Sequence, residues 1–334
     1  MKILASGPSG PATELEPLRA AGHEVVIGRP LDQPGRAAYS AADLGAAARD
    51  CHVILASHLD AITGAVMDAT TKLRLVIVPF IGVDKIEVSA ASERGILVAN
   101  SPTPENFIAV AEATVALTLM LQKRIKHNEA KLRRGEWAQR GDRGEFLFGK
   151  TVGLVGLGRV GSHVARRLVN WDVRLLACDP YVTAERARSL GATLVDLPTL
   201  LAESDVVSLH PSLTDETRTL IGEKALRAMK PTAILINTAR GEIADEEAIA
   251  RALTEGWIAG AALDAFTREP LPAVSPLRDV DPERLILTPH NVSHSEAGRR
   301  ANLQLAFDQI LAAGRGEVPA HCVNPETIPR WRTA

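Results

Sequence analysis

Short apolar runs rich in β-branched residues alternate with helical stretches along most of this 334-residue chain. In the first hundred residues the strand-like runs are 2–6, 24–28, 53–56, 75–78 and 97–99, separated by helical stretches such as 12–21 and 44–50. A second series has strand-like runs at 151–155, 173–179, 193–195, 205–210, 233–238, 258–264 and 285–288, with helical stretches at 160–170, 197–203, 223–229 and 245–255. Because strands joined by helices lie parallel, the alternation predicts an α/β fold with helices on both faces of parallel sheets.

Two breaks in this pattern suggest how the chain divides into domains. A Pro-rich segment at 101–104 ends the first series, and a turn near residue 290 precedes a last helical stretch at 297–313. We interpret the breaks as two chain crossings between domains. The sequence then predicts a discontinuous first domain, residues 1–101 and 295–334, and a second domain, residues 102–294.

The segment between the two series is expected to be a long helix from about residue 105 to 134, followed by a polar, Gly-rich loop to residue 149. Its most apolar part, 108–121, is interrupted by Glu112 and is too short for a membrane span. We expect this helix to be buried on most sides, and a second subunit is one candidate for the surface that packs against it.

Composition excludes several classes of protein. The net charge is −2 and no stripe of Lys and Arg is present, so nucleic acid is not an expected partner. The start of the sequence lacks the apolar run of a signal peptide. Cys51, Cys178 and Cys322 are too few and too scattered for a disulfide framework or a zinc site. We therefore expect a cytoplasmic protein with no metal site and no membrane contact.

A Gly-rich turn lies between the expected strand at 151–155 and the helix that follows it. The first two glycines of such a turn let the backbone approach a diphosphate, and the third lets helix and strand pack closely. The helix N-terminus then faces the negative charge of the phosphates. The turn predicts a dinucleotide site at Gly156, Gly158, Arg159, Val160 and Gly161.

Asp179 ends the next expected strand, eighteen residues after Gly161. A carboxylate at this place accepts hydrogen bonds from ribose hydroxyls and repels the additional phosphate of NADP. The sequence therefore predicts NAD as the cofactor.

Three further candidate residues follow expected strands of the second series. Arg240 follows the run 233–238, Glu269 lies in the loop after 258–264, and His290 follows 285–288. Ligands of open parallel sheets bind beyond the carboxyl ends of the strands, so these side chains can reach one crevice.

Their chemistry is that of hydride transfer to a carbonyl group. An imidazole with a pKa of about 6.5 can give a proton to the oxygen or take it back near neutral pH. A carboxylate beside it orients the ring and raises its pKa, and a guanidinium binds a substrate carboxylate in bidentate fashion. His290, Glu269 and Arg240 are accordingly the expected catalytic residues.

With these residues in place, the sequence resembles the D-isomer-specific 2-hydroxyacid dehydrogenase family. The matching segments run in family order from about residue 75 to 295. They are Gly82-Val83-Asp84, residues 106–112, residues 148–153, the turn 156–161, Leu209-His210-Pro211, residues 237–241, residues 262–266, residues 269–272 and Thr288-Pro289-His290.

The resemblance implies a Rossmann-type NAD-binding domain, a flavodoxin-like substrate domain built from both chain ends, a cleft between them, and a homodimer joined through the cofactor domain. It implies that Arg240 binds the carboxylate and carbonyl of a 2-oxo acid, and that His290, assisted by Glu269, interconverts that acid with a D-2-hydroxy acid. Further implied cofactor contacts are His210, Pro211, Thr217, Thr238, Ala239 and Asp264. Implied substrate contacts are Ile81 and Gly82, besides Arg240 and His290.

One loop departs from the family pattern, and two other functions remain open. The loop before Gly82 usually carries small residues, whereas Phe80 and Ile81 stand here and are expected to narrow the pocket or make one wall apolar. An NAD(H)-sensing corepressor on the same fold is an alternative that the motifs alone do not reject. Formate oxidation is disfavoured, because relatives with that activity place Gln where Glu269 stands.

Overall fold

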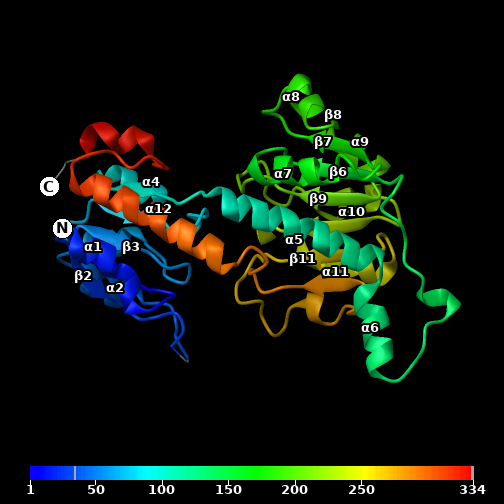
Figure 1. Cartoon of the computed structure of the whole chain (residues 1–334), viewed down its shortest axis with the longest axis horizontal. Helices are drawn as coiled ribbons and strands as arrows, with labels where there is room; N and C mark the ends of the chain where they lie inside the picture. The colour runs from blue at the N-terminus through cyan, green and yellow to red at the C-terminus, as the bar shows by residue number, and fades with distance from the viewer. Residues whose placement is uncertain (34, 332–334) are drawn as a thin grey trace. The chain divides into compact units, whose positions relative to one another are not determined.

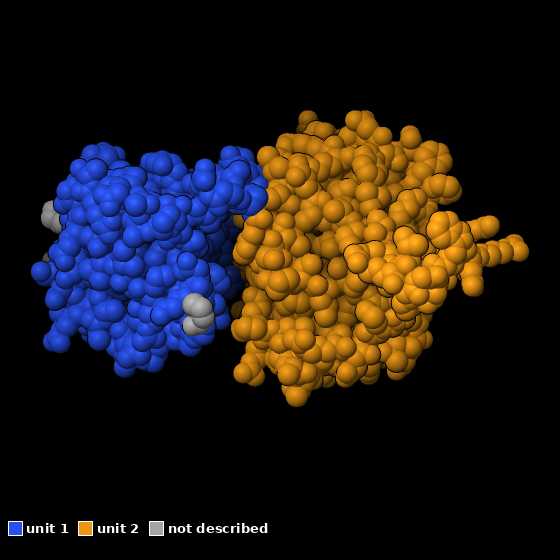
Figure 2. Space-filling view, turned by 60° about the horizontal axis from the view of Figure 1, so that its bottom comes forward, with its two compact units in different colours: residues 1–105, 295–334 blue, residues 106–294 orange. Residues whose placement is uncertain are grey.

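A computed structural model describes residues 1–33 and 35–331. The chain forms two compact units, Met1–Glu105 with Ser295–Ala334 (unit 1) and Asn106–His294 (unit 2), coloured separately in Figure 2. Each unit has its own parallel sheet and its own hydrophobic core, as the alternating pattern predicted.

Unit 1 contains a five-stranded parallel sheet in the order β2-β1-β3-β4-β5. The strands are β1 (Lys2–Ala5), β2 (Glu24–Ile27), β3 (Val53–Leu55), β4 (Leu75–Ile77) and β5 (Leu97–Ala99). This is the strand order of flavodoxin-like folds. The predicted flavodoxin-like topology of this part of the chain is confirmed.

Alternate residues of these strands face opposite sides of the sheet, and each side is covered by its own helices. One side, with Leu4 and Val76, packs against α2 (Ala41–Ala48), α3 (Gly64–Asp68) and α4 (Val88–Glu93). The other side, with Ile3 and Ile77, packs against α1 (Glu16–Ala20) and α12 (Glu296–Gly314), which returns from the far end of the sequence (Figure 1). The 3₁₀ turns η1 (Ala12–Leu15) and η5 (Pro325–Arg330) complete the unit.

Unit 2 contains a seven-stranded parallel sheet in the order β12-β11-β10-β9-β6-β7-β8. The strands are β6 (Thr151–Val155), β7 (Arg174–Cys178), β8 (Ala192–Leu194), β9 (Val206–Leu209), β10 (Ile234–Asn237), β11 (Gly260–Leu263) and β12 (Leu285–Leu287). Read from its first strand, β6, this is the Rossmann order with one strand added at the far edge. The predicted Rossmann-type domain is confirmed.

Helices also cover both sides of the unit-2 sheet. The side with Leu154 and Ile236 packs against α5 (Pro104–Gln122), α7 (Arg159–Leu168) and α8 (Ala184–Ser189). The side with Val207 and Leu235 packs against α9 (Leu197–Glu203), α10 (Glu223–Ala228) and α11 (Glu246–Glu255). The order of strands reverses between β6 and β9, which puts a ligand-binding crevice at the carboxyl ends of these two strands.

The long helix expected from residue 105 to 134 is wrong in one respect, because it is broken. α5 ends at Gln122, and α6 (Ile125–Arg133) begins after Arg124, whose φ of 51° lies in the left-handed region. The Arg124 side chain donates to the carbonyl of Gly141 and forms an ion pair with Glu283. These contacts lie far along the chain, so the local sequence pattern carried no sign of the break.

The expectation that α5 is buried on most sides is also not met within one chain. Residues 104–122 are long and apolar enough, by length and composition alone, to cross a membrane, yet only 28% of that window is buried. Ala111 and Leu117 pack into the unit-2 core, while neighbouring apolar residues on the other faces of the helix are partly exposed.

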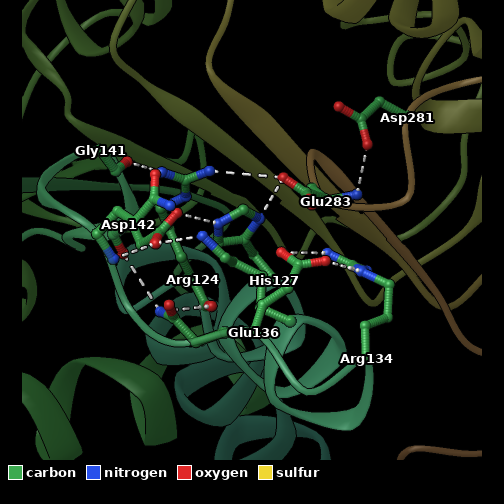
Figure 3. A network of polar contacts seen from close by, with 11 residues as sticks. Arg124, His127, Arg134, Glu136, Gly141, Asp142, Asp281 and Glu283 are labelled. Atoms are coloured by element: carbon green, nitrogen blue, oxygen red, sulfur yellow. Dashed lines mark hydrogen bonds and ion pairs between the residues drawn. The ribbon is translucent and has the colours of Figure 1, made fainter.

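A network of charges attaches α6 and the segment after it to the body of unit 2 (Figure 3). His127 lies between two carboxylates, with Nε2 2.7 Å from Oδ1 of Asp142 and Nδ1 2.5 Å from Oε2 of Glu283. Asp142, in the 3₁₀ turn η2 (Arg140–Asp142), also binds Lys131 at 2.6 Å. Because Glu283 precedes β12, the network joins three separate segments of the chain.

Candidate active site

The Gly-rich turn joins β6 to α7. Other backbone atoms lie close to Gly156 and Gly161, whereas the space beside Gly158 is open. Gly156 has φ +89°, a conformation that strains other residues. A Cβ on Gly156 would lie 2.9 Å from the carbonyl carbon of His210, and one on Gly161 would overlap the carbonyl oxygen of Gly156. Around a Cβ on Gly158, by contrast, no described atom lies within 4 Å. The turn is therefore open where a diphosphate has to approach.

The first turn of α7 has the electrostatic character of an anion site. No side chain caps this helix, and its first turn contains no acidic residue. The unpaired N–H groups and the helix dipole therefore favour a negative charge before Gly158. The exposed side chain of Arg159 adds a positive charge, while Val160 packs against the core below. These residues fit the diphosphate of a dinucleotide.

Asp179 lies directly beside the turn, at the end of β7. Its Oδ2 accepts a hydrogen bond from the backbone N–H of Leu157 at 2.8 Å, and its Oδ1 accepts one from the backbone N–H of Tyr181 at 2.9 Å. These bonds hold the carboxylate at the mouth of the turn, where it can accept hydrogen bonds from ribose hydroxyls.

His210 and Pro211 form the opposite wall of the turn, after β9. Burial lowers the pKa of His210 to about 4, so its ring is neutral at pH 7. Nε2 lies 2.9 Å from Oγ of Ser208, whereas Nδ1 is buried with no hydrogen-bond partner among the described residues. Thr217, a few residues on, uses its hydroxyl to close a local turn, donating to the carbonyl of Ser212 at 2.7 Å.

His290 and Glu269 form the pair that the sequence predicted. Nδ1 of His290 lies 2.8 Å from Oε1 and 2.9 Å from Oε2 of Glu269. Glu269 also accepts a hydrogen bond from the backbone N–H of Phe266 at 3.0 Å, which fixes the carboxylate in its loop. The two side chains keep 42% and 37% of their surface exposed, so a substrate can reach the imidazole.

The pair shifts the pKa values of both groups in opposite directions. The hydrogen bond to Glu269 raises the pKa of His290 above its ordinary value, against the opposing effects of burial and of the Arg240 charge. Burial alone would raise the pKa of Glu269, but its hydrogen bonds from His290 and from Phe266 outweigh that effect and lower it. The arrangement therefore favours a protonated imidazole beside an ionised carboxylate.

Arg240 follows β10 in a loop held by Asn237. The side-chain oxygen of Asn237 accepts from the N–H of Ala239 at 3.1 Å, and its amide donates to the carbonyl of Arg240 at 2.9 Å. Thr238, which is buried, contacts Thr114 of α5 through the two hydroxyl oxygens, 3.0 Å apart. The loop carrying Arg240 is thus fixed from the strand end and from α5.

Asp264 is a buried carboxylate at the end of β11, and it holds the loop of His290. Its Oδ1 accepts from the hydroxyl of Thr288 at 2.7 Å and from the backbone N–H of Asn291 at 3.1 Å. The two donors lie on either side of His290 in the chain. Asp264 therefore anchors the segment that presents the imidazole.

The loops of Arg240 and Glu269 touch at a glycine. A Cβ on Gly241 would overlap backbone atoms of Phe266 and Thr267, so only glycine allows this approach. Glu246, at the start of α11, accepts from the N–H of Thr267 at 2.6 Å. The structure thus brings Arg240, Glu269 and His290 together at the carboxyl ends of β10, β11 and β12.

The other predicted substrate residues, Ile81 and Gly82, lie in unit 1, in the loop after β4. The amide of Asn100 donates to the carbonyl of Ile81 at 2.8 Å, and the N–H of Ser101 donates to that of Phe80 at 2.8 Å. Phe80 packs partly against the unit-1 core. Phe80 is therefore part of the packing of unit 1.

Comparison with known proteins agrees with this geometry. Residues 115–292 match the family described as D-isomer specific 2-hydroxyacid dehydrogenase, NAD binding domain. A glyoxylate reductase from Thermofilum pendens is 42% identical over 289 residues, covering 84% of this chain and 83% of that protein. A D-3-phosphoglycerate dehydrogenase from Methanocaldococcus jannaschii is 38% identical over 84% of this chain, but only 53% of that protein is covered.

Solved structures are similar to almost the whole chain. The TT0316 protein from Thermus thermophilus superposes with a TM-score of 0.85 at 34% identity, covering 97% of this chain and all of that one (100%). An NAD-dependent formate dehydrogenase from Staphylococcus aureus in complex with NAD has a TM-score of 0.79 at 29% identity, covering 93% and 94%. The chain belongs to the D-isomer-specific 2-hydroxyacid dehydrogenase family. It is an oxidoreductase of 2-hydroxy acids, with NAD as its cofactor.

Several residues that shape the site were not singled out from the sequence. Thr288 and Asn237 have a detectable signal, since each is a polar residue at the end of an expected strand. Ser208, the partner of His210, and Glu246, which holds the Glu269 loop, carry no such signal, because their roles depend on contacts between segments.

Proposed function

We propose that this protein interconverts a 2-oxo acid and a D-2-hydroxy acid, with His290 as general acid/base, Glu269 as its partner, and Arg240 as the substrate anchor. The observation that carries the proposal is the two-oxygen contact of Glu269 with Nδ1 of His290, in the unit that holds the dinucleotide turn. The pair leaves Nε2 as the ring nitrogen for proton exchange with a substrate.

The proposed reduction moves one hydride and one proton. NADH held at the Gly-rich turn would supply the hydride for the carbonyl carbon of the 2-oxo acid. His290 gives the proton from Nε2 to the carbonyl oxygen, so that a hydroxyl forms and the ring becomes neutral, with its Nδ1–H still directed at Glu269. In the oxidative direction neutral His290 takes the proton from the hydroxyl, and the Glu269 carboxylate stabilises the resulting imidazolium.

Arg240 binds the substrate in this proposal. A guanidinium offers paired N–H donors that match a carboxylate. Its positive charge also polarises the neighbouring carbonyl group of the 2-oxo acid. Its own charge acts on His290 and Glu269, lowering the pKa of both, so it belongs to the same electrostatic environment. Contacts of Ile81 and Gly82 with the substrate remain a prediction from the resemblance.

The remaining cofactor contacts are proposed from position. The residues that would hold the diphosphate are Gly156, Gly158, Arg159, Val160 and Gly161, and Asp179 would accept hydrogen bonds from the adenosine ribose. Walls of the cofactor site are assigned to His210, Pro211, Thr217, Thr238, Ala239 and Asp264.

For the substrate, the relatives favour a small 2-oxo acid. Similar glyoxylate reductases match along 83% to 86% of their length, whereas similar phosphoglycerate dehydrogenases match along about half. The test is NADH oxidation against glyoxylate, hydroxypyruvate, pyruvate, phenylpyruvate and longer 2-oxo acids, with NADPH in parallel. Turnover of one of them, lost in His290→Ala, supports the proposal; an absence of turnover with all of them contradicts it.

For the partner, we propose a second copy of the chain, in the cytoplasm. Support comes from the partly exposed apolar helix α5 and from exposed side chains near it in the sequence, Leu132, Trp137 and Phe148. Light scattering at low protein concentration tests it, and a monomer would contradict it.

A further inference from the structure

Arg159, the arginine inside the Gly-rich turn, lies over the ring of Phe107. The guanidinium carbon is 5.2 Å from the ring centroid, within the range of a cation–π interaction. Phe107 belongs to the first helical turns of α5 and is 9% exposed. The Gly-rich turn, residues 156–161, does not itself contain Phe107, so the contact with Arg159 joins the turn to a separate helix.

The position of Arg159 is electrostatically unfavourable without a negative partner. It is the first residue of α7, at the positive end of the helix dipole, and the first turn has no acidic residue that would offset its charge. Within residues 1–33 and 35–331, Arg159 has no ion pair and no side-chain hydrogen bond. The face of Phe107 is the contact that the structure gives its guanidinium.

Phe107 is itself held firmly, because α5 is attached along α7. Glu112 of α5 forms an ion pair with Arg167 of α7 at 2.9 Å. Between the two contacts, Ala111 packs into the same buried cluster as Val164. The ring under Arg159 is thus fixed by two packed helices rather than by a mobile loop.

We propose that Phe107 is a positioning residue that holds the Arg159 guanidinium ready for the diphosphate of NAD. The face of a ring attracts the charge of a guanidinium and takes up none of its five N–H groups as a conventional hydrogen-bond acceptor would, so these donors stay available for a phosphate. An arginine side chain loses much rotational freedom when it binds a phosphate. Phe107 restricts that freedom before the cofactor arrives, which strengthens binding.

The experiment measures the dissociation constant of NADH by fluorescence titration, and so does not depend on turnover. Phe107→Leu keeps an apolar side chain but removes the ring face, and we expect it to weaken NADH binding by about threefold. Phe107→Tyr keeps the ring and restores binding. In the steady state, the KM for NADH rises by more than kcat falls.

A double-mutant cycle separates positioning from general packing. If Phe107 acts through Arg159, then Phe107→Leu has no further effect on NADH binding once Arg159 is replaced by Ala. The same loss in both backgrounds would overturn the proposal, and so would unchanged binding in Phe107→Leu. Thermal unfolding of each variant identifies one that is simply misfolded, and the Tyr variant then carries the test.

A matched control is available elsewhere in the same unit. Phe146 lies under the ammonium group of Lys123 at 4.8 Å and is 72% exposed. Phe146→Leu makes the same substitution in another cation–π pair, away from the turn, and leaves NADH binding unchanged. Since NADH binding is measured without a 2-oxo acid, failure of the proposed oxo-acid chemistry and failure of this inference give different results.

Discussion

The imidazole of His290 meets both carboxylate oxygens of Glu269, although residue 290 has a backbone φ of 52°. This left-handed conformation is uncommon outside glycine and costs of order 1 kcal/mol. It persists because Asp264 holds the chain on either side of His290, through Thr288 and Asn291. With this backbone conformation, the imidazole ring is directed at Glu269.

Replacing His290 by Ala tests its role as proton donor. We expect kcat to fall by about 10² to 10⁴, because general acid catalysis contributes that much, while NADH binding changes little. Single-turnover kinetics and NADH titration measure the two quantities separately. A parallel loss in both would show that the residue supports the fold or the cofactor site instead.

The pH profile should depend on Glu269. Reduction requires protonated His290, so kcat/KM falls as the pH rises through its pKa, which Glu269 raises. In Glu269→Gln that support is lost, while burial and Arg240 still lower the pKa. The alkaline limb of the profile therefore moves to lower pH. Identical limbs in both proteins would mean that another group controls the profile.

Thr288→Val removes a hydrogen bond from a buried carboxylate. Asp264 keeps its hydrogen bond from the N–H of Asn291 but loses the one from the hydroxyl of residue 288. We therefore expect the free energy of unfolding to fall by about 1.5 kcal/mol. Because the same segment presents His290, kcat falls as well. Urea denaturation and steady-state kinetics measure the two effects, and Thr288→Ser serves as the control that restores both.

Asp179 should govern the choice between the two nicotinamide cofactors. Asp179→Ala removes the charge that repels a 2′-phosphate, so the preference for NADH over NADPH narrows. The variant also loses the acceptor for the N–H of Leu157, so NADH binding weakens too. Titrations with both cofactors measure the ratio; an unchanged ratio would place the discrimination elsewhere.

The network around His127 should make the attachment of α6 depend on pH. Hydrogen bonding to Asp142, then to Glu283, raises the pKa of His127, against burial and the charge of Arg124. A raised folded-state pKa adds stability that is complete below the unfolded value, near 6.5, and is lost as the pH rises through the folded value. His127→Gln is therefore more destabilising at pH 6 than in alkaline solution. Lys131, which pairs with Asp142, adds a further positive charge to the network, and Figure 3 shows the ion pair of Arg134 and Glu136 beside it.

Hydrogen exchange of residues 134–146 provides the local readout of that network. In the wild type their protection should decrease as the pH rises, after correction for the intrinsic exchange rate, and in His127→Gln it should be low throughout. Equal protection profiles would show that Lys131 and Arg124 suffice to hold the segment.

Much of the fold could be predicted from local pattern. Each expected strand lies within two residues of an observed one, because short β-branched runs between turns are strong local signals. The turn at Gly156 and the residues after β10, β11 and β12 were found because parallel strands bring their carboxyl ends to one edge.

What could not be predicted depends on contacts between distant segments. The break at Arg124 is fixed by Gly141 and Glu283, and the ring under Arg159 comes from a helix that precedes the turn by some fifty residues. The anchoring of the His290 loop needs Asp264 and Thr288, 24 positions apart. Periodicity describes neighbours along the chain and so contains no information about such pairs.

The return of α12 to the first sheet has a consequence for the order in which the protein can be made. As the chain leaves the ribosome, all of residues 106–294 emerge before α12, which supplies Phe307 and Ile310 to one side of the unit-1 sheet. Unit 2 can therefore fold during synthesis, while Ile3 and Ile77 remain exposed to solvent until α12 is made. The nascent protein therefore carries an incompletely covered apolar sheet for most of its translation, until α12 packs onto it.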